Sequence, residues 1–287
     1  MKREVGREQY FTTRELARRC VDFTASLVDW NSFEHYLEPS AGEGSFLELL
    51  PQARRTGLDV EPRAAEVTKA DFLGWEPPPL RGRMLTIGNP PFGQRAALAF
   101  SFLHRACAFS DVVGFILPRS FNKYTFQNRV PGTFHLLGSF DCQDFYGRAR
   151  QPQSVNAVFQ VWERRDELRA RVDPPGTHPD FDMRHCHLSR AKPTDLVALR
   201  AGYAFGVAQV GSDFKPKAVA SVTTGSHWFI RPRVPQVRAR FERLDFAFLD
   251  GMNTAHKSLS KRDIVTAYEA VVEADRLTVA VPPLTPA

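Results

Sequence analysis

The stretch Thr86–Gly93 constrains the fold most strongly, because an uncharged apolar run ends there on two consecutive prolines. The residues Met84–Ile87 are apolar or β-branched, which is typical of a buried strand. Pro90 and Pro91 lack a backbone N–H, so neither can continue a central strand of a sheet. We therefore predict a stiff turn at the carboxyl end of a buried strand.

The turn also carries groups that suit a planar ring with an exocyclic amine. The Asn89 side-chain oxygen and the Pro90 backbone oxygen can both accept hydrogen bonds from an amine, and Phe92 can stack on a ring. A strand followed by an ordinary Pro-Pro turn is the alternative interpretation.

The sequence Asn89-Pro90-Pro91-Phe92 resembles the catalytic motif of amino-methyltransferases that use S-adenosylmethionine, especially N6-adenine DNA methyltransferases. The resemblance implies catalytic roles for these four residues and a contact of Asn89 with the cofactor. It implies an α/β fold, a Rossmann-like class I methyltransferase domain with a mixed seven-stranded sheet. It also implies S-adenosyl-L-methionine as cofactor and double-stranded DNA as partner. A base within a duplex cannot reach such a turn, so the target adenine must be flipped out and stacked on Phe92.

A glycine-rich segment, Leu37–Phe46, predicts a short strand, a tight turn and a helix from Ser45 to Leu50. Glycine leaves no side chain between the backbone and a ligand, and a helix N-terminus offers free N–H groups. The acids Glu38 and Glu43 disfavour a pyrophosphate and favour a ligand that carries an ammonium group, as S-adenosylmethionine does. The resemblance implies that the cofactor contacts in this segment are Glu38, Pro39, Ser40, Gly42 and Gly44.

Two acidic stretches further along resemble the family's other cofactor motifs. Gly57–Pro62 predicts a strand that ends in acid, where Asp59 would accept from the ribose hydroxyls with Glu61 as an accessory. Two solvated acids at a strand end are the alternative. The resemblance implies that Asp71 and the backbone N–H of Phe72 hold the adenine of the cofactor. A helix N-cap is the other role open to Asp71.

Phe11 and Thr12 precede a predicted helix, Arg14–Leu27, whose apolar residues recur at steps of three and four. In the family, an aromatic-Thr segment at this place lies against the methionine end of the cofactor. Phe11 and Thr12 are therefore candidates for that contact, although core packing is equally open to Phe11.

The second half of the predicted sheet follows from four segments. Ala96–Phe109 predicts a helix and Val112–Leu117 a strand. Phe134–Phe145 and Ser154–Trp162 predict the antiparallel pair that closes the sheet in this family.

Two further site predictions lie in this region. Alignment with the family's last strand makes Trp162 a second base-stacking residue, with ordinary core burial as the alternative. The basic loop Tyr146–Gln153 offers Arg148 and Arg150 to DNA phosphates, unless they are ordinary solvent charges.

The resemblance ends near Arg164, and Asp173–Gly176 has the composition of a linker. We predict a catalytic domain over residues 1–165 and a smaller α+β target-recognition region with a C-terminal helix over residues 166–287. Short strands are predicted in that region over Phe181–Leu188, Tyr203–Val210 and Trp228–Ile230.

A basic bias marks the same region. Between Arg184 and Arg243 there are eleven Lys or Arg and three Asp or Glu, so 11 − 3 = +8. Such an excess fits a polyanionic partner, and a solvated basic face is the alternative. Arg231 and Arg233 are the candidate DNA-binding residues.

Ser260–Asp263 predicts a capping box that opens a helix ending near Ala274. The apolar face of this helix is expected to dock onto the catalytic domain or onto a second copy of the chain, so a homodimer is one predicted assembly.

Composition excludes several classes of protein. Hydrophobic residues make up 43% and charged residues 24% of 287, as in soluble globular proteins. No apolar run approaches the roughly 18 residues of a membrane-spanning helix, and Met1–Val5 shows no apolar signal region. We expect a cytoplasmic, nucleoid-associated protein of a bacterium or phage.

The cysteines give no sign of a metal site. All four are scattered without a Cys-x-x-Cys pair. Adjacent residues of His185–His187 would point to opposite faces of a strand, so no metal is predicted there.

The order of cofactor motif, catalytic motif and C-terminal region resembles the γ arrangement of DNA methyltransferases. We therefore predict a site-specific DNA adenine-N6 methyltransferase, either with a restriction partner or as an orphan enzyme with an epigenetic role. The rivals are an RNA adenine or guanine methyltransferase, an enzyme that modifies a protein glutamine, and a non-catalytic nucleic-acid-binding relic.

Overall fold

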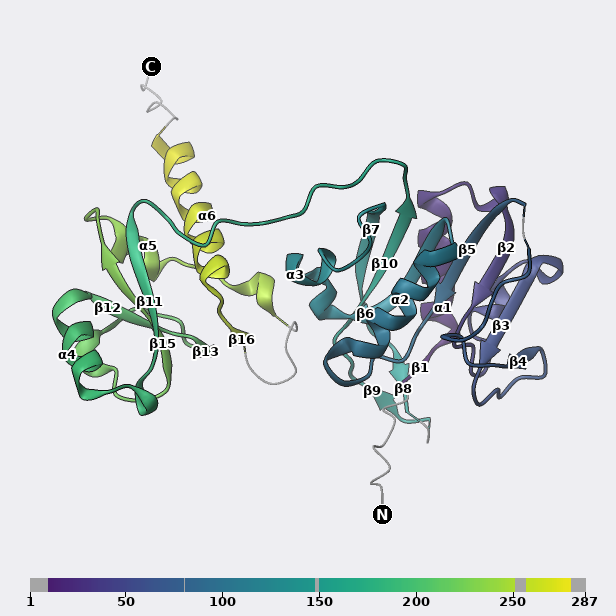
Figure 1. The fold of residues 1–287 in the computed structure, drawn as a ribbon, viewed down its shortest axis with the longest axis horizontal. Helices are drawn as coiled ribbons and strands as arrows, with labels where there is room; N and C mark the ends of the chain where they lie inside the picture. Colours follow the sequence, from purple (N-terminus) through teal and green to yellow (C-terminus); the bar gives the residue numbers. More distant parts are fainter. Residues whose placement is uncertain (1–9, 80, 148–149, 251–256, 280–287) are drawn as a thin grey trace, which may run out of the picture. The chain divides into compact units, whose positions relative to one another are not determined.

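The computed structural model describes residues 10–79, 81–147, 150–250 and 257–279, and the chain divides into two compact units, Met1–Val172 and Asp173–Ala287. Figure 1 shows both units, and each is described here by itself.

The N-terminal unit is built on a seven-stranded sheet with the order β4-β3-β2-β5-β6-β10-β7. The first five strands run parallel, and β10 lies antiparallel to both β6 and β7. This sheet confirms the predicted α/β fold with a mixed seven-stranded sheet. The bounds are β2 Phe33–Glu38, β3 Arg55–Asp59, β4 Val67–Lys69, β5 Arg83–Gly88, β6 Val112–Pro118, β7 Phe134–Cys142 and β10 Ala157–Arg164.

Helices cover both faces of this sheet (Figure 1). Helix α1 (Arg14–Leu27) packs into the apolar cluster that includes Phe33 and Ile87. Helix α2 (Ala97–Phe109) packs into a second cluster, with Leu37 and Phe115 from the other face. A short helix, α3, spans Tyr124–Gln127.

Helix α1 forms where its sequence predicts it. Thr13 caps the N-terminus, since its side chain accepts a hydrogen bond from the Leu16 backbone N–H. Leu16, Cys20 and Thr24 are buried along one face, at the spacing of a helix packed on a sheet.

The chain order places a topological switch point between β2 and β5. From β2 the chain continues outward to β3 and β4, and β5 then starts the other half of the sheet. Ligands of open parallel sheets bind outside the carboxyl ends of the strands at such a point. Here those ends carry Glu38 on β2 and Gly88 on β5.

A small three-stranded sheet lies beside this edge, with the order β1-β8-β9. Strand β1 is Phe11–Thr12, β8 is Phe145–Tyr146 and β9 is Pro152–Gln153. The predicted strand Phe134–Phe145 was therefore too long, because β7 ends at Cys142 and Phe145 pairs with Thr12 in the small sheet.

The predicted helix Ser45–Leu50 was also wrong. The segment forms turns and a single 3₁₀ turn, Leu47–Leu49. The buried Glu38 carboxylate accepts from the Leu47 N–H at 2.6 Å, so a side chain rather than a helical turn satisfies that donor.

The C-terminal unit has a four-stranded antiparallel sheet with the order β11-β15-β12-β14. Helix α4 packs with Phe229 and Leu188 on one face, and α5 and α6 pack with Phe205 and Ile230 on the other (Figure 1). The bounds are β11 Phe181–His187, α4 Pro193–Gly202, β12 Phe205–Ala208, β14 Lys217–Ala218, β15 Ser226–Pro232, α5 Val237–Glu242 and α6 Lys261–Val279, with β13 (Val210–Gly211) paired to β16 (Lys257–Ser258).

The capping box of α6 is present. The Ser260 N–H donates to the Asp263 carboxylate at 2.7 Å, and the Asp263 N–H donates to the Ser260 hydroxyl at 3.2 Å. The apolar face of α6, with Ile264 and Tyr268, is buried in the core of its own unit. The expectation that this face docks onto the catalytic domain or a second copy is therefore wrong.

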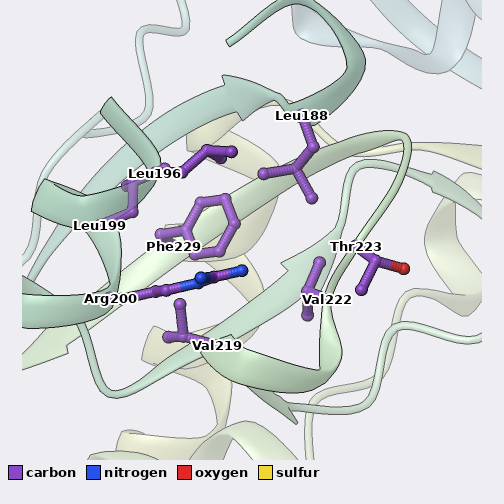
Figure 2. A pocket seen from close by; sticks show the side chains of 8 residues that line it. All are labelled: Leu188, Leu196, Leu199, Arg200, Val219, Val222, Thr223 and Phe229. Carbon is purple, nitrogen blue, oxygen red and sulfur yellow. The ribbon is translucent and has the colours of Figure 1, made fainter. Parts of the chain in front are cut away.

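A small cavity lies between α4 and the sheet, lined by apolar side chains together with Arg200 and Thr223. Its volume is about 90 Å³, and Leu188, Leu199 and Phe229 contribute to its lining (Figure 2). No helix within the described ranges is both long and apolar enough to cross a membrane.

Candidate active site

The Asn89–Phe92 turn follows β5 directly, at the switch point of the sheet. The Asn89 amide nitrogen Nδ2 donates to the Tyr10 backbone oxygen at 3.2 Å and to the Thr12 hydroxyl oxygen at 3.1 Å. A carbonyl oxygen can only accept, so the group that faces Tyr10 must be the NH₂ of the amide. The orientation of the Asn89 side chain is thus determined by its partners.

The other end of the amide is available to a ligand. In the described part of the chain, no donor bonds to Asn89 Oδ1. The Asn89 backbone oxygen accepts from the Ser40 hydroxyl at 3.0 Å, which ties the turn to the glycine-rich loop. Pro90 is buried, whereas Phe92 is half-buried with its ring centroid 6.4 Å from that of Tyr10.

The glycine-rich loop is held by Asp59, at the end of β3. One carboxylate oxygen of Asp59 accepts from the Gly42 N–H at 2.8 Å, and the other accepts from the Glu61 N–H at 2.8 Å. Gly42 and Gly44 have φ of 49° and 85°, a region that strongly favours glycine. The predicted ribose ligand Asp59 and the loop residues therefore lie together.

The buried side chain of Glu38 holds the same loop through hydrogen bonds. Only 2% of its surface is exposed, and its carboxylate accepts from the Leu47 and Phe46 N–H groups. Burial raises the pKa of Glu38 well above its usual value, although the two backbone donors act in the opposite direction. The structure gives Glu38 a role in holding the loop rather than in touching a ligand, which corrects the prediction of a direct contact.

Glu43 connects the loop to the small sheet. Its carboxylate accepts from the Tyr146 hydroxyl at 3.1 Å and from Arg150 Nη2 at 2.7 Å. The Tyr146 ring stacks on Phe11 at 5.5 Å between centroids. The Gly42 position lies against the same Phe11 ring, 3.8 Å from where a Cβ would stand.

Tyr146 is the site residue that sequence reasoning missed. Burial, followed by the Glu43 carboxylate, raises the pKa of its hydroxyl, so Tyr146 acts as a hydrogen-bond donor to Glu43. An aromatic residue that opens a polar loop after a predicted strand was the available signal.

The predicted adenine contacts lie after β4. The Asp71 side chain accepts from the Leu73 N–H at 3.0 Å, which forms a local turn rather than a helix N-cap. The Phe72 side chain is 1% exposed and packs on Phe102 at 5.1 Å between ring centroids. The Phe72 side chain is thus part of the core, and the contact of its backbone N–H with the cofactor adenine stays a prediction.

Trp162 does not fit the role of base stacking. It is 1% exposed, lies in the core cluster of α2, and donates through Nε1 to Gln160 Oε1 at 3.2 Å. A fully packed indole has no free face for a base, so the prediction was wrong and the core-burial alternative is correct.

The predicted DNA-binding arginines are found in ion pairs or outside the described residues. Arg148 lies outside the described residues. Arg150 pairs with Glu43, and Arg231 and Arg233 both pair with Asp182. All three described guanidiniums remain more than half exposed.

Within the described residues, no group of three or more His, Cys, Asp or Glu side chains is arranged to hold a metal ion. No family model matches the sequence. No curated protein matches it either.

Several solved structures are similar to part of the chain. A "putative RNA methyltransferase" from Pyrococcus horikoshii has 19% identity and a TM-score of 0.44, over 55% of this chain and 88% of that chain. The N-methyltransferase NodS from Bradyrhizobium japonicum has 14% identity and a TM-score of 0.39, over 54% and 96%. A "putative methylase" from Haemophilus influenzae has 13% identity and a TM-score of 0.37, over 53% and 99%. The fold assignment rests on the strand order of the sheet, and these likenesses add nothing to it about substrate or activity.

Proposed function

We propose that the chain is a site-specific DNA adenine-N6 methyltransferase that uses S-adenosyl-L-methionine. The observation that carries the proposal is the Asn89 amide, whose NH₂ end is anchored to Tyr10 and Thr12. Its oxygen is thereby left to accept from an exocyclic amine at the carboxyl end of β5.

The residues around the switch point fit the cofactor. Asp59 and Glu61 place carboxylates at the end of β3, where a ribose diol needs acceptors, and Gly42 brings the backbone close. Asp71 and the Phe72 backbone are the candidates for the adenine. The bound cofactor would supply a methyl group activated on a sulfonium.

The chain's own residues would prepare the amine. Asn89 Oδ1 and the Pro90 backbone oxygen accept the two hydrogens of the amine, which draws its lone pair out of conjugation with the ring. Phe92 holds the ring by stacking. Fixing both reactants in one geometry removes much of the entropic barrier, and Ser40 fixes the turn relative to the loop.

The test is a methylation assay with labelled cofactor on duplex DNA, on RNA and on protein, followed by mass spectrometry of the hydrolysed product. We expect N6-methyladenine from duplex DNA. Label in RNA or glutamine instead would replace the substrate assignment, and no label with no cofactor binding in calorimetry would support the non-catalytic relic.

Asn89→Ala is the decisive variant. Loss of both amide ends should lower turnover by about a hundredfold to a thousandfold, because a positioned hydrogen-bonding group of this kind contributes about 3–4 kcal/mol, while the cofactor dissociation constant stays within a few-fold. Asn31→Ala is the matched control, because Asn31 is exposed in the same unit. Retained turnover in Asn89→Ala would refute the role of Asn89.

A further inference from the structure

A polar hollow of about 500 Å³ lies at the edge strand β11 of the C-terminal unit. Small-ligand sites typically measure about 300–1,000 Å³, so the hollow has room for one phosphate and its sugar. The residues that matter for its chemistry are Asp182, Met183, Tyr203, Arg231, Arg233 and Lys261.

Two of the three cations share one carboxylate. Asp182 faces Arg231 across the strands β11 and β15, and its Oδ2 accepts from Arg231 Nη2 at 3.0 Å. Asp182 also accepts from Arg233, through Nη2 and, at 3.3 Å, through Nε. Hydrogen bonding from Arg233 and then from Arg231 lowers the pKa of Asp182, so it stays ionised at neutral pH.

The charges in the hollow do not cancel. One carboxylate balances one of the two guanidiniums, and Lys261 adds a further positive charge, so the sum is 3 − 1 = +2. Asp182 is the one carboxylate among the lining residues; Asp180 pairs with Arg240, and Glu269 contacts His178, which also lines the hollow.

The placement of the two guanidiniums in the hollow also suits the binding of an anion. The Arg231 guanidinium carbon lies 5.7 Å from the Tyr203 ring centroid, which limits the positions of that side chain. Guanidinium forks match phosphate oxygens in pairs, and both forks are more than half exposed.

We propose that this hollow binds one phosphodiester group of duplex DNA, with Arg231, Arg233 and Lys261 as donors. Asp182 holds the two guanidiniums in place until the phosphate displaces it from one of them. The inference rests on the proposed function, and it adds a site with Lys261, Tyr203 and Asp182 to the two arginines expected from the sequence.

The test measures the affinity of the full chain for a fluorescent duplex by anisotropy, at several salt concentrations and without cofactor. Arg231→Gln with Arg233→Gln should weaken binding by about tenfold and reduce the slope of log affinity against log salt by about one, since one phosphate contact is lost. Lys261→Gln should weaken binding by a smaller factor. Arg276→Gln, an exposed arginine of the same unit, is the control and should change neither quantity.

The Asp182→Asn variant should change the affinity for the duplex in the opposite direction. Removal of the competing carboxylate charge should tighten DNA binding by a few-fold, which a misfolded variant would not do. Inorganic phosphate in competition should weaken duplex binding to the wild type more than to the Arg231→Gln, Arg233→Gln double variant.

The two proposals fail separately. If the wild type methylates DNA while the double variant and Asp182→Asn bind the duplex as the wild type does, the phosphate site is wrong and the proposed function stands. If the variants change duplex binding as expected but no DNA is methylated, the proposed function is wrong. Binding of inorganic phosphate at this hollow with no effect on duplex affinity also overturns the inference.

Discussion

At the scale of single residues, the orientation of one amide decides what the candidate active site can do. Asn89 has two chemically different ends, and a backbone oxygen and a hydroxyl oxygen select the donor end. Thr12, which lies 5% exposed in β1, is therefore a positioning residue for Asn89 as well as a candidate cofactor contact.

Thr12→Val tests this positioning. Valine has the same shape but no acceptor, so the Asn89 NH₂ keeps only the Tyr10 oxygen and becomes less well held. The loss of one hydrogen bond is worth about 1 kcal/mol, so we expect turnover to fall about fivefold with a smaller change in substrate KM. Thr12→Ser should restore turnover. Equal loss in both variants would show that the Thr12 hydroxyl does not account for the effect and would refute the positioning role.

Residue positions were predictable where a short motif carries them. Asn89, Gly42 and Asp59 lie together because Asp59 ends one parallel strand and the other two follow parallel strands at the same edge of the sheet. Trp162 could not be placed correctly, because alternation along a strand buried on both faces does not say which face carries a site. The contact of Tyr146 with Glu43 spans 103 positions and depends on the small sheet, which no local pattern predicts.

At the scale of elements, strand β3 packs so closely against the glycine-rich loop that one of its positions has room only for glycine. Gly57 lies in β3, and a Cβ added there would stand 2.6 Å from Leu47 Cδ2 and 3.3 Å from Ala41 Cβ. Both neighbours are buried, so neither can move freely.

Gly57→Ala should therefore lower the free energy of unfolding of the N-terminal unit by about 1–3 kcal/mol, the usual cost of overpacking. It should also weaken cofactor binding, because Leu47 and Ala41 flank the loop. Gly202→Ala is the control, since nothing lies within 4 Å of its Cβ position. Urea unfolding followed by circular dichroism measures both variants, and an unchanged midpoint for Gly57→Ala would contradict the packing argument.

Helices with a clear cap and a continuous apolar face were predicted well, and helices without these signals were not. Helix α1 has a cap and a continuous apolar face, and the structure gives it the predicted bounds Arg14–Leu27. Helix α4 was missed, because Leu199 is its only fully buried residue and no apolar stripe marks it.

At the scale of the whole molecule, the charge count from the sequence overstated the basic surface. Acids outside the counted window, namely Asp180, Asp182 and Asp275, form ion pairs with arginines inside it. With these three included the sum is 11 − 6 = +5, so the net positive charge is smaller than the sequence window indicates. Ion pairs between distant segments cannot be counted within a sequence window.

Burial of His35 makes the stability of the folded chain depend on pH in one direction. Burial lowers the pKa of His35, whose Nε2 lies 2.9 Å from the Thr56 hydroxyl. The unfolded chain therefore takes up a proton at a higher pH than the folded chain does, so stability is full above the unfolded pKa and falls as the pH drops below about 6.5.

We expect the N-terminal unit to lose stability between pH 7.5 and pH 5.5, and His35→Gln to lose less over the same range. Urea unfolding at both values measures the difference. His104→Gln, which changes an exposed histidine of the same unit, should keep the wild-type dependence. An equal pH response in wild type and His35→Gln would assign the acid sensitivity to other groups.

The bond from Asn89 to the Tyr10 oxygen has a consequence for how such a chain can vary over evolutionary time. Every amino acid at position 10 presents the same peptide oxygen, so this bond constrains the residue at position 89 and not the side chain at position 10, which is constrained instead by its contact with Phe92. An aspartate at position 89 would set one of its carboxylate oxygens against the Tyr10 backbone oxygen, 79 positions away along the chain, and this isosteric exchange should be selected against.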